Sequence, residues 1–96
     1  MIKKQYLKSR PVCKVTFELP KTVEAETAQI VGDFTGWAAV PMEQLKDGRF
    51  KAVLELEQGR EYQFRYLLNE HEWQNDAEAD KYVGNPFNSE NSVLAV

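Results

Sequence analysis

Apolar and polar residues alternate along much of the chain with a period of two. Cys13, Val15, Phe17 and Leu19 alternate with mostly polar side chains, and the run stops at Pro20. Such alternation is typical of a β-strand that buries one face. Further strands are expected over residues 28–31, 50–56, 62–68 and 92–96, with a short edge strand over 81–83.

Turn-forming residues separate these predicted strands. Asp47-Gly48 is typical of a hairpin turn in which both central residues have positive φ. The strands on either side of Gln58-Gly59 are joined by so short a turn that we expect them to pair antiparallel. Helical structure is limited to one turn at most, over 76–81. About seven short antiparallel strands with regular turns predict an all-β, immunoglobulin-like β-sandwich.

Length, composition and charge limit the classes of protein that fit this pattern. A chain of 96 residues with 43% apolar and 28% charged residues is expected to form one soluble globular domain. Its 12 basic and 15 acidic residues give a net charge of −3, whereas electrostatic nucleic-acid binders carry a basic excess. The apolar runs are too short to cross a bilayer. Neither nucleic acid nor a membrane is therefore expected as a partner.

The N-terminal segment has a different composition from the rest. Residues 1–11 carry four basic side chains around Tyr6 and Leu7 and end at Pro11. This composition predicts a basic, loosely ordered arm before a single domain over residues 12–96. The segment lacks the apolar stretch of a signal peptide, so a cytoplasmic location is expected.

Few residues are suited to catalysis or metal binding. Cys13, the single cysteine, shares a strand face with apolar residues, so we expect it to be buried rather than nucleophilic. His71, the single histidine, lacks partners with the spacing of a zinc site. Asp76, Glu78 and Asp80 lack the glycine and final glutamate of a calcium loop and predict a solvated acidic loop. We therefore expect no cofactor, no metal and no enzymatic activity.

The two tryptophans are the strongest candidate binding residues. Trp37 follows Gly36 in a loop and Trp73 lies in a polar turn, so neither belongs to an alternating apolar face. Packing in the core is the alternative for each. An exposed indole suits a ligand with an apolar face and polar edges, such as a pyranose ring. Two further residues have groups suited to hydroxyl oxygens: Arg65, on the outward face of its strand, has several donors, and Asn91, near the last strand, has both a donor and an acceptor.

A longer pattern resembles a known family. The motif Gly32-Asp33-Phe34-Thr35-Gly36-Trp37 is followed in order by segments at 41–42, 45, 47–50, 54–56, 59, 62–66, 73–76, 80 and 91–93. Together these segments resemble the isoamylase N-terminal early-set domain, also called carbohydrate-binding module family 48. The family includes the glycogen-binding domain of the AMP-activated kinase β subunit. The resemblance covers about residues 12–96.

The resemblance implies an early-set β-sandwich that binds an α-1,4-glucan or maltooligosaccharide. In members that bind glycogen, residues matched here by Trp37 and Trp73 stack on glucose units. Residues matched by Arg65 and Asn91 contact sugar hydroxyls. These four are therefore the expected carbohydrate-binding residues, and Phe34 matches a phenylalanine of the core.

The chain departs from the family pattern in two loops. The turn over residues 69–72 is one residue longer than usual, which could displace Trp73 from the plane of Trp37. Where the family inserts a bulky side chain into the glucan, only Phe87 or Asn88 could serve.

Three functions fit these observations. The first is a non-catalytic glucan-binding module that acts alone or docks on an enzyme of glycogen metabolism, since the length leaves no room for a catalytic barrel. The second is a protein-interaction or dimerisation domain that has lost the sugar site, suggested by the outward-facing apolar residues Val53 and Leu67. A glycoside hydrolase has the least support, because its chemistry needs two carboxyl groups held across a cleft.

Overall fold

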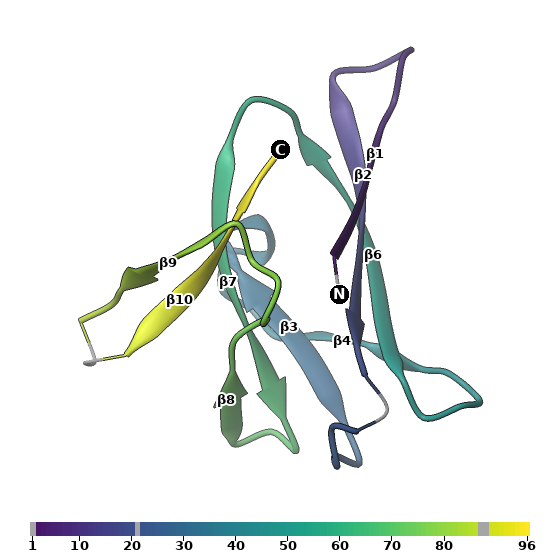
Figure 1. Cartoon of the computed structure of the whole chain (residues 1–96), viewed down its shortest axis with the longest axis vertical. Coiled ribbons are helices and arrows are strands. Elements are labelled where there is room, and N and C mark those ends of the chain that lie inside the picture. The colour runs from purple at the N-terminus through teal and green to yellow at the C-terminus, as the bar shows by residue number, and fades with distance from the viewer. Residues whose placement is uncertain (1, 21, 87–88) are drawn as a thin grey trace.

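The computed structural model describes residues 2–20, 22–86 and 89–96. Within them, two antiparallel β-sheets face each other, which confirms the predicted all-β sandwich (Figure 1). The strands are β1 (Ile2–Tyr6), β2 (Val12–Leu19), β3 (Ala28–Gly32), β4 (Val40–Pro41), β5 (Glu43–Gln44), β6 (Phe50–Glu57), β7 (Glu61–Leu68), β8 (Glu72–Gln74), β9 (Lys81–Gly84) and β10 (Glu90–Ala95), and a 3₁₀ turn, η1, spans Asp33–Thr35.

The two sheets differ in size and order. The four-stranded sheet has the order β1-β2-β6-β5. The six-stranded sheet has the order β4-β3-β7-β10-β9, and β8 pairs with β7 beside this path. All strand pairs are antiparallel. No helix in the described part of the chain is long and apolar enough to cross a membrane.

The apolar faces of both sheets meet in an aromatic core. Phe17 of β2 lies 5.2 Å from Phe64 of β7 and 5.5 Å from Phe34 of η1, measured between ring centroids. Tilted and edge-on contacts of this kind stabilise aromatic pairs beyond the area they bury. Phe34 thus packs on the core, as expected from the sequence. Cys13 is fully buried on the same face of β2, and burial raises the pKa of its thiol.

The predicted hairpin across Gln58-Gly59 is wrong. β6 pairs with β2 in one sheet, whereas β7 pairs with β3 and β10 in the other. The connection crosses between the sheets and is tied to both: Gln58 N donates to the carbonyl of Pro11, and Gly59 N donates to that of Val96. Each strand has one apolar face, and opposing sheets bury both faces at once. The alternation therefore identified the strands but not their partners.

The predicted loosely ordered arm is wrong over Ile2–Tyr6. This segment forms β1, which pairs along its whole length with β2. Only Ile2 is half-buried and the rest is exposed, so backbone hydrogen bonds rather than side-chain burial hold the strand. Lys4 Nζ also lies 2.8 Å from Asp80 Oδ2, next to the other sheet. A lysine-bearing edge strand is a common protection against unwanted pairing.

The strand count is higher than the expected seven because short strands border the long ones. β4, β5 and β8 have two, two and three residues, too few for a visible alternation. The Asp47-Gly48 turn does join β5 to β6, but only Gly48 has positive φ, at 96°. Gly48 N donates to the carbonyl of Leu45, so the connection is a turn followed by a bulge rather than the two-residue turn expected. Residues 76–81 form no helical turn.

Candidate functional site

The four expected binding residues line one hollow on the outer face of the six-stranded sheet. The side chains of Trp37 and Trp73 are 43% and 47% exposed, so neither fills the core. The hollow has a volume of about 670 Å³, within the usual range for small-molecule sites. Its lining is Trp37, Arg65, Trp73, Asn85, Pro86, Ser89 and Asn91.

Arg65 and Trp73 are brought together by the pairing of β7 with β8. Trp73 lies opposite Leu67, two residues along β7 from Arg65, so all three side chains point outward. Trp73 thus lies on a short strand rather than in the expected turn. The guanidinium carbon of Arg65 is 5.4 Å from the centroid of the Trp73 ring, in the range of a cation–π contact.

The nitrogen atoms of Arg65 make only some of the hydrogen bonds that they could donate. Its Nη1 donates to Ser89 Oγ at 3.3 Å. Its Nε is buried and has no hydrogen-bond partner within the described residues. The positive charge is therefore held at the base of the hollow by the Trp73 ring and the Ser89 hydroxyl.

Trp37 is presented by a tight turn that begins at Gly32. A Cβ atom on Gly32 would lie 2.5 Å from the Gln63 carbonyl oxygen and 2.7 Å from Phe64 Cβ, so the turn is pressed against β7. Gly36 and Trp37 both have left-handed backbones, with φ of 64° and 62°. This conformation is unusual for a bulky residue, and such strain is concentrated at binding and active sites.

Asn91 contributes through its neighbours more than through its own surface. It is only 8% exposed. Its Nδ2 donates to Gln63 Oε1 and its Oδ1 accepts from Asn85 Nδ2, both at 3.1 Å. Asn85 in turn donates to Ser89 Oγ at 2.8 Å. A chain of polar side chains therefore crosses the floor of the hollow from β7 to the loop after β9.

Asn85, Pro86 and Ser89 also line the hollow, although they were not among the expected binding residues. A cluster of Asn, Pro and Ser is typical of a turn, but nothing in it indicates that the turn folds over the outer face of the sheet. Phe87 and Asn88, expected to reach into a glucan, lie outside the described residues.

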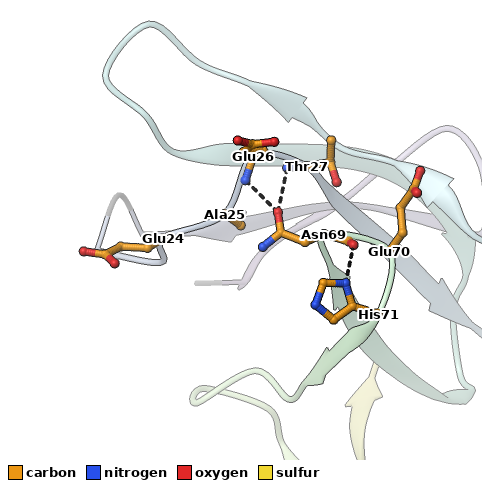
Figure 2. Close-up of a pocket in the computed structure, with 7 residues that line it drawn as sticks. All are labelled: Glu24, Ala25, Glu26, Thr27, Asn69, Glu70 and His71. Atoms are coloured by element: carbon orange, nitrogen blue, oxygen red, sulfur yellow. Dashed lines mark hydrogen bonds between the residues drawn. The ribbon is translucent and has the colours of Figure 1, made fainter.

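The longer turn before Trp73 and segment 24–27 together line a second hollow (Figure 2). Asn69 and Glu70 both have positive φ, which lets the chain reverse tightly between β7 and β8. Figure 2 shows the Asn69 side chain pointing at segment 24–27, where its Oδ1 accepts from the backbone N–H groups of Glu26 and Thr27. Despite its extra residue, the turn leaves Trp73 in the same hollow as Trp37.

His71 and Asp76, two of the residues considered for metal binding or catalysis, make contacts within the protein itself. His71 is exposed on the second hollow, where its Nδ1 lies 2.6 Å from the Asn69 carbonyl (Figure 2). The expected solvated loop is wrong for Asp76, which is 3% exposed and accepts a 2.6 Å hydrogen bond from the Tyr66 hydroxyl. Among the described residues, no group of three or more His, Cys, Asp and Glu could hold a metal ion.

No protein-family model matches the chain, and no curated protein matches its sequence. The fold and the site together define a class: a two-sheet β-sandwich with an aromatic and amide-lined hollow on the outer face of one sheet. Stacking surfaces and hydrogen-bonding groups lie side by side in this hollow. That arrangement suits a ligand that is apolar on one face and hydroxylated at its edges.

Proposed function

We propose that this protein is a non-catalytic α-glucan-binding module of the carbohydrate-binding module family 48 type. The observation that carries the proposal is the convergence of Trp37, Arg65, Trp73 and Asn91 on one exposed hollow. These residues come from four separate parts of the sequence. The resemblance described above rests on sequence motifs and concerns the same four positions.

The chemistry of the hollow matches that of a glucose chain. A pyranose ring has an apolar face of C–H groups, which stacks on an indole, and hydroxyl groups around its edge. The rings of Trp37 and Trp73 offer such surfaces. Arg65, Asn85 and Ser89 offer donors and acceptors for the hydroxyls. Binding to so few side chains is expected to be weak, with a Kd of about 10 μM to 1 mM.

Binding rather than catalysis is proposed because the hollow holds stacking and amide groups where a glycosidase needs two carboxyl groups. The buried carboxylate of Asp76 is outside the hollow and accepts hydrogen bonds from Tyr66 and from the Glu78 backbone. With glycogen or a maltooligosaccharide as ligand, a cytoplasmic location and docking on an enzyme of glycogen metabolism belong to the same proposal.

Titration with maltoheptaose tests the proposal. Tryptophan fluorescence and backbone amide NMR shifts should change together, with the largest shifts around Trp37, Arg65 and Trp73. Trp37→Ala and Trp73→Ala should each weaken binding about tenfold or more, since stacking on an aromatic ring is the main apolar contact. Tyr6→Ala removes another exposed aromatic, on β1, and should leave binding unchanged. No response at about 10 mM sugar would contradict the proposal.

A protein-interaction or dimerisation domain is the second candidate. Val53 of β6 is 42% exposed on the outer face of the four-stranded sheet, which supports this alternative. Leu67, the other apolar residue expected to be exposed, is half-buried and lies opposite Trp73. Sedimentation of the wild type and of Val53→Lys over a wide concentration range tests it. A dimer that Val53→Lys dissociates would favour this function over sugar binding.

A further inference from the structure

The carboxylate of Asp33 joins the turn that carries Trp37 to strand β7. Its Oδ1 accepts a 3.0 Å hydrogen bond from the indole Nε1 of Trp37. Its Oδ2 accepts a 2.8 Å hydrogen bond from the backbone N–H of Gln63. One carboxylate therefore ties an exposed ring to β7, a central strand of the sheet that forms the floor of the hollow.

Backbone geometry alone does not fix the indole ring. The turn is closed by Trp37 N donating to the Gly32 carbonyl at 2.9 Å and by Thr35 Oγ1 donating to the same carbonyl at 3.0 Å. These bonds hold the Cα of Trp37, but the exposed side chain can still rotate about its χ angles. The Asp33 contact is the hydrogen bond that involves the indole itself.

This contact also decides which part of Trp37 a ligand can use. An indole has a single N–H donor, and here that donor already faces a carboxylate. Trp37 is left to offer the face of its ring, while hydrogen bonding to the ligand falls to the Arg65 side of the hollow. The polar and apolar contacts of the site are thus separated in space.

We propose that Asp33 is a positioning residue for the site, which holds the Trp37 ring as a fixed stacking surface by occupying its indole N–H. This inference rests on the proposed function only in one respect, the effect of Asp33 on sugar affinity. The restraint on the ring is a property of the free protein and can be measured without any ligand.

The first measurement follows the indole N–H signals by NMR. The chain has two tryptophans, so Trp73→Phe assigns the signal of Trp37. Asp33→Ala should move this signal upfield and speed its hydrogen exchange about tenfold, because a charge-assisted bond is lost. The Trp73 signal should not change. Asp47→Ala, a matched control, removes another exposed aspartate that accepts from a turn backbone, and should leave both signals unchanged.

The second measurement is a double-mutant cycle on maltoheptaose affinity. Asp33→Ala should weaken binding about fivefold to tenfold, since the ring must be ordered when the sugar binds. Trp37→Phe keeps an aromatic ring without an N–H, so adding Asp33→Ala to it should cause little further loss. Asp33→Asn keeps the side-chain shape and one acceptor. It replaces Asp33→Ala in both measurements if the alanine variant fails to fold.

The outcomes separate the inference from the proposed function. An unchanged Trp37 indole signal in both Asp33 variants overturns the inference, whether or not the protein binds sugar. Additive losses in the cycle also overturn it, because Asp33 would then act through Gln63 rather than through the indole. A wild type that never binds maltoheptaose contradicts the proposed function, while the indole exchange rates still test the role of Asp33.

Discussion

The guanidinium of Arg65 lies against the ring of Trp73, with 5.4 Å between the guanidinium carbon and the ring centroid. The two residues are joined through adjacent strands, β7 and β8, whose register places both on the outer face. A guanidinium can stack flat on an indole while its edge donates hydrogen bonds, which a lysine ammonium cannot do. The pair therefore combines an ordered stacking surface with a hydroxyl-binding edge.

Arg65→Lys should weaken maltoheptaose binding about threefold to tenfold, although it keeps the positive charge. The lost contribution is the planar stack on Trp73 and the bond to Ser89, each worth about 0.5 kcal/mol at a partly exposed site. Isothermal titration calorimetry measures the change. Arg60→Lys is a matched control, because Arg60 lies 5.9 Å over the ring of Tyr62, outside the hollow. Equal affinities for Arg65→Lys and the wild type would contradict the role given to the stack.

Tyr66→Phe should destabilise the fold by about 1.5 to 3 kcal/mol. The Tyr66 hydroxyl donates to Asp76, whose side chain is almost entirely buried, and removing the donor weakens the support of a buried carboxylate. Urea unfolding monitored by circular dichroism gives the change. Tyr6→Phe removes a hydroxyl from a residue that is 53% exposed and should change stability by less than about 0.5 kcal/mol. Similar losses in both variants would contradict a special role for the Tyr66–Asp76 bond.

The same pair predicts a loss of stability at high pH. Burial raises the pKa of the Tyr66 hydroxyl, and the neighbouring Asp76 carboxylate raises it further. An unfolded tyrosine ionises near pH 10, so above about pH 10 the unfolded state releases a proton that the folded state keeps. Stability from this group is complete below that pH and falls by about 1.4 kcal/mol per pH unit above it. Urea midpoints between about pH 9 and pH 11 should fall less steeply for Tyr66→Phe, and parallel curves would contradict this assignment.

Gly32→Ala should destabilise the protein by about 2 kcal/mol or more. Its Cβ would meet backbone and Cβ atoms of β7 at 2.5 and 2.7 Å, which cannot move aside as a flexible side-chain tip could. The turn that carries Trp37 would have to lift from the sheet, so sugar affinity should fall as well. Gly84→Ala is the matched control, because its Cβ would meet no atom of the described residues within 4 Å. Thermal unfolding of both variants decides whether the close approach matters.

Alternating patterns revealed where the longest strands, β2, β6 and β7, are, because one face of each is more deeply buried than the other. They could not reveal sheet membership: β6 and β7 have similar patterns whether they pair or face each other across the core. They also missed β1, whose side chains are mostly exposed and whose strand structure comes from backbone pairing with β2. Burial leaves a periodic signal in sequence, and backbone pairing alone does not.

Site residues could be predicted where the residue type itself implies binding chemistry. They could not be predicted where a residue acts by holding another residue in place. Trp37, Trp73 and Arg65 stood out as large groups off the apolar faces, and the structure brings them together. Asp33 carries an ordinary exposed carboxylate, so only its hydrogen bond with the Trp37 indole relates it to the hollow. Asn85 was hidden for a similar reason, because its contacts depend on how the loop after β9 folds back.

Glu70→Gly should stabilise the protein by about 1 kcal/mol. Glu70 is exposed and has φ of 66°, a conformation that costs a residue with a Cβ about 1 to 2 kcal/mol and costs glycine little. Its neighbour Asn69 also has positive φ but tolerates it better and bonds Glu26 and Thr27, so the strain is concentrated at Glu70. Chemical denaturation should show a higher midpoint with an unchanged slope.

The matched control for this substitution is Glu72→Gly. Glu72 is equally exposed but lies on β8 with an ordinary backbone, so glycine there should lower stability by about 0.5 to 1 kcal/mol. Opposite signs for the two substitutions would show that strain, and not the loss of a negative charge, sets the effect at Glu70. A loss of stability in both variants would mean that the turn does not strain the backbone. Because β8 carries Trp73, maltoheptaose affinity of Glu70→Gly should remain at the wild-type level if relieving the strain leaves the register of β7 and β8 intact.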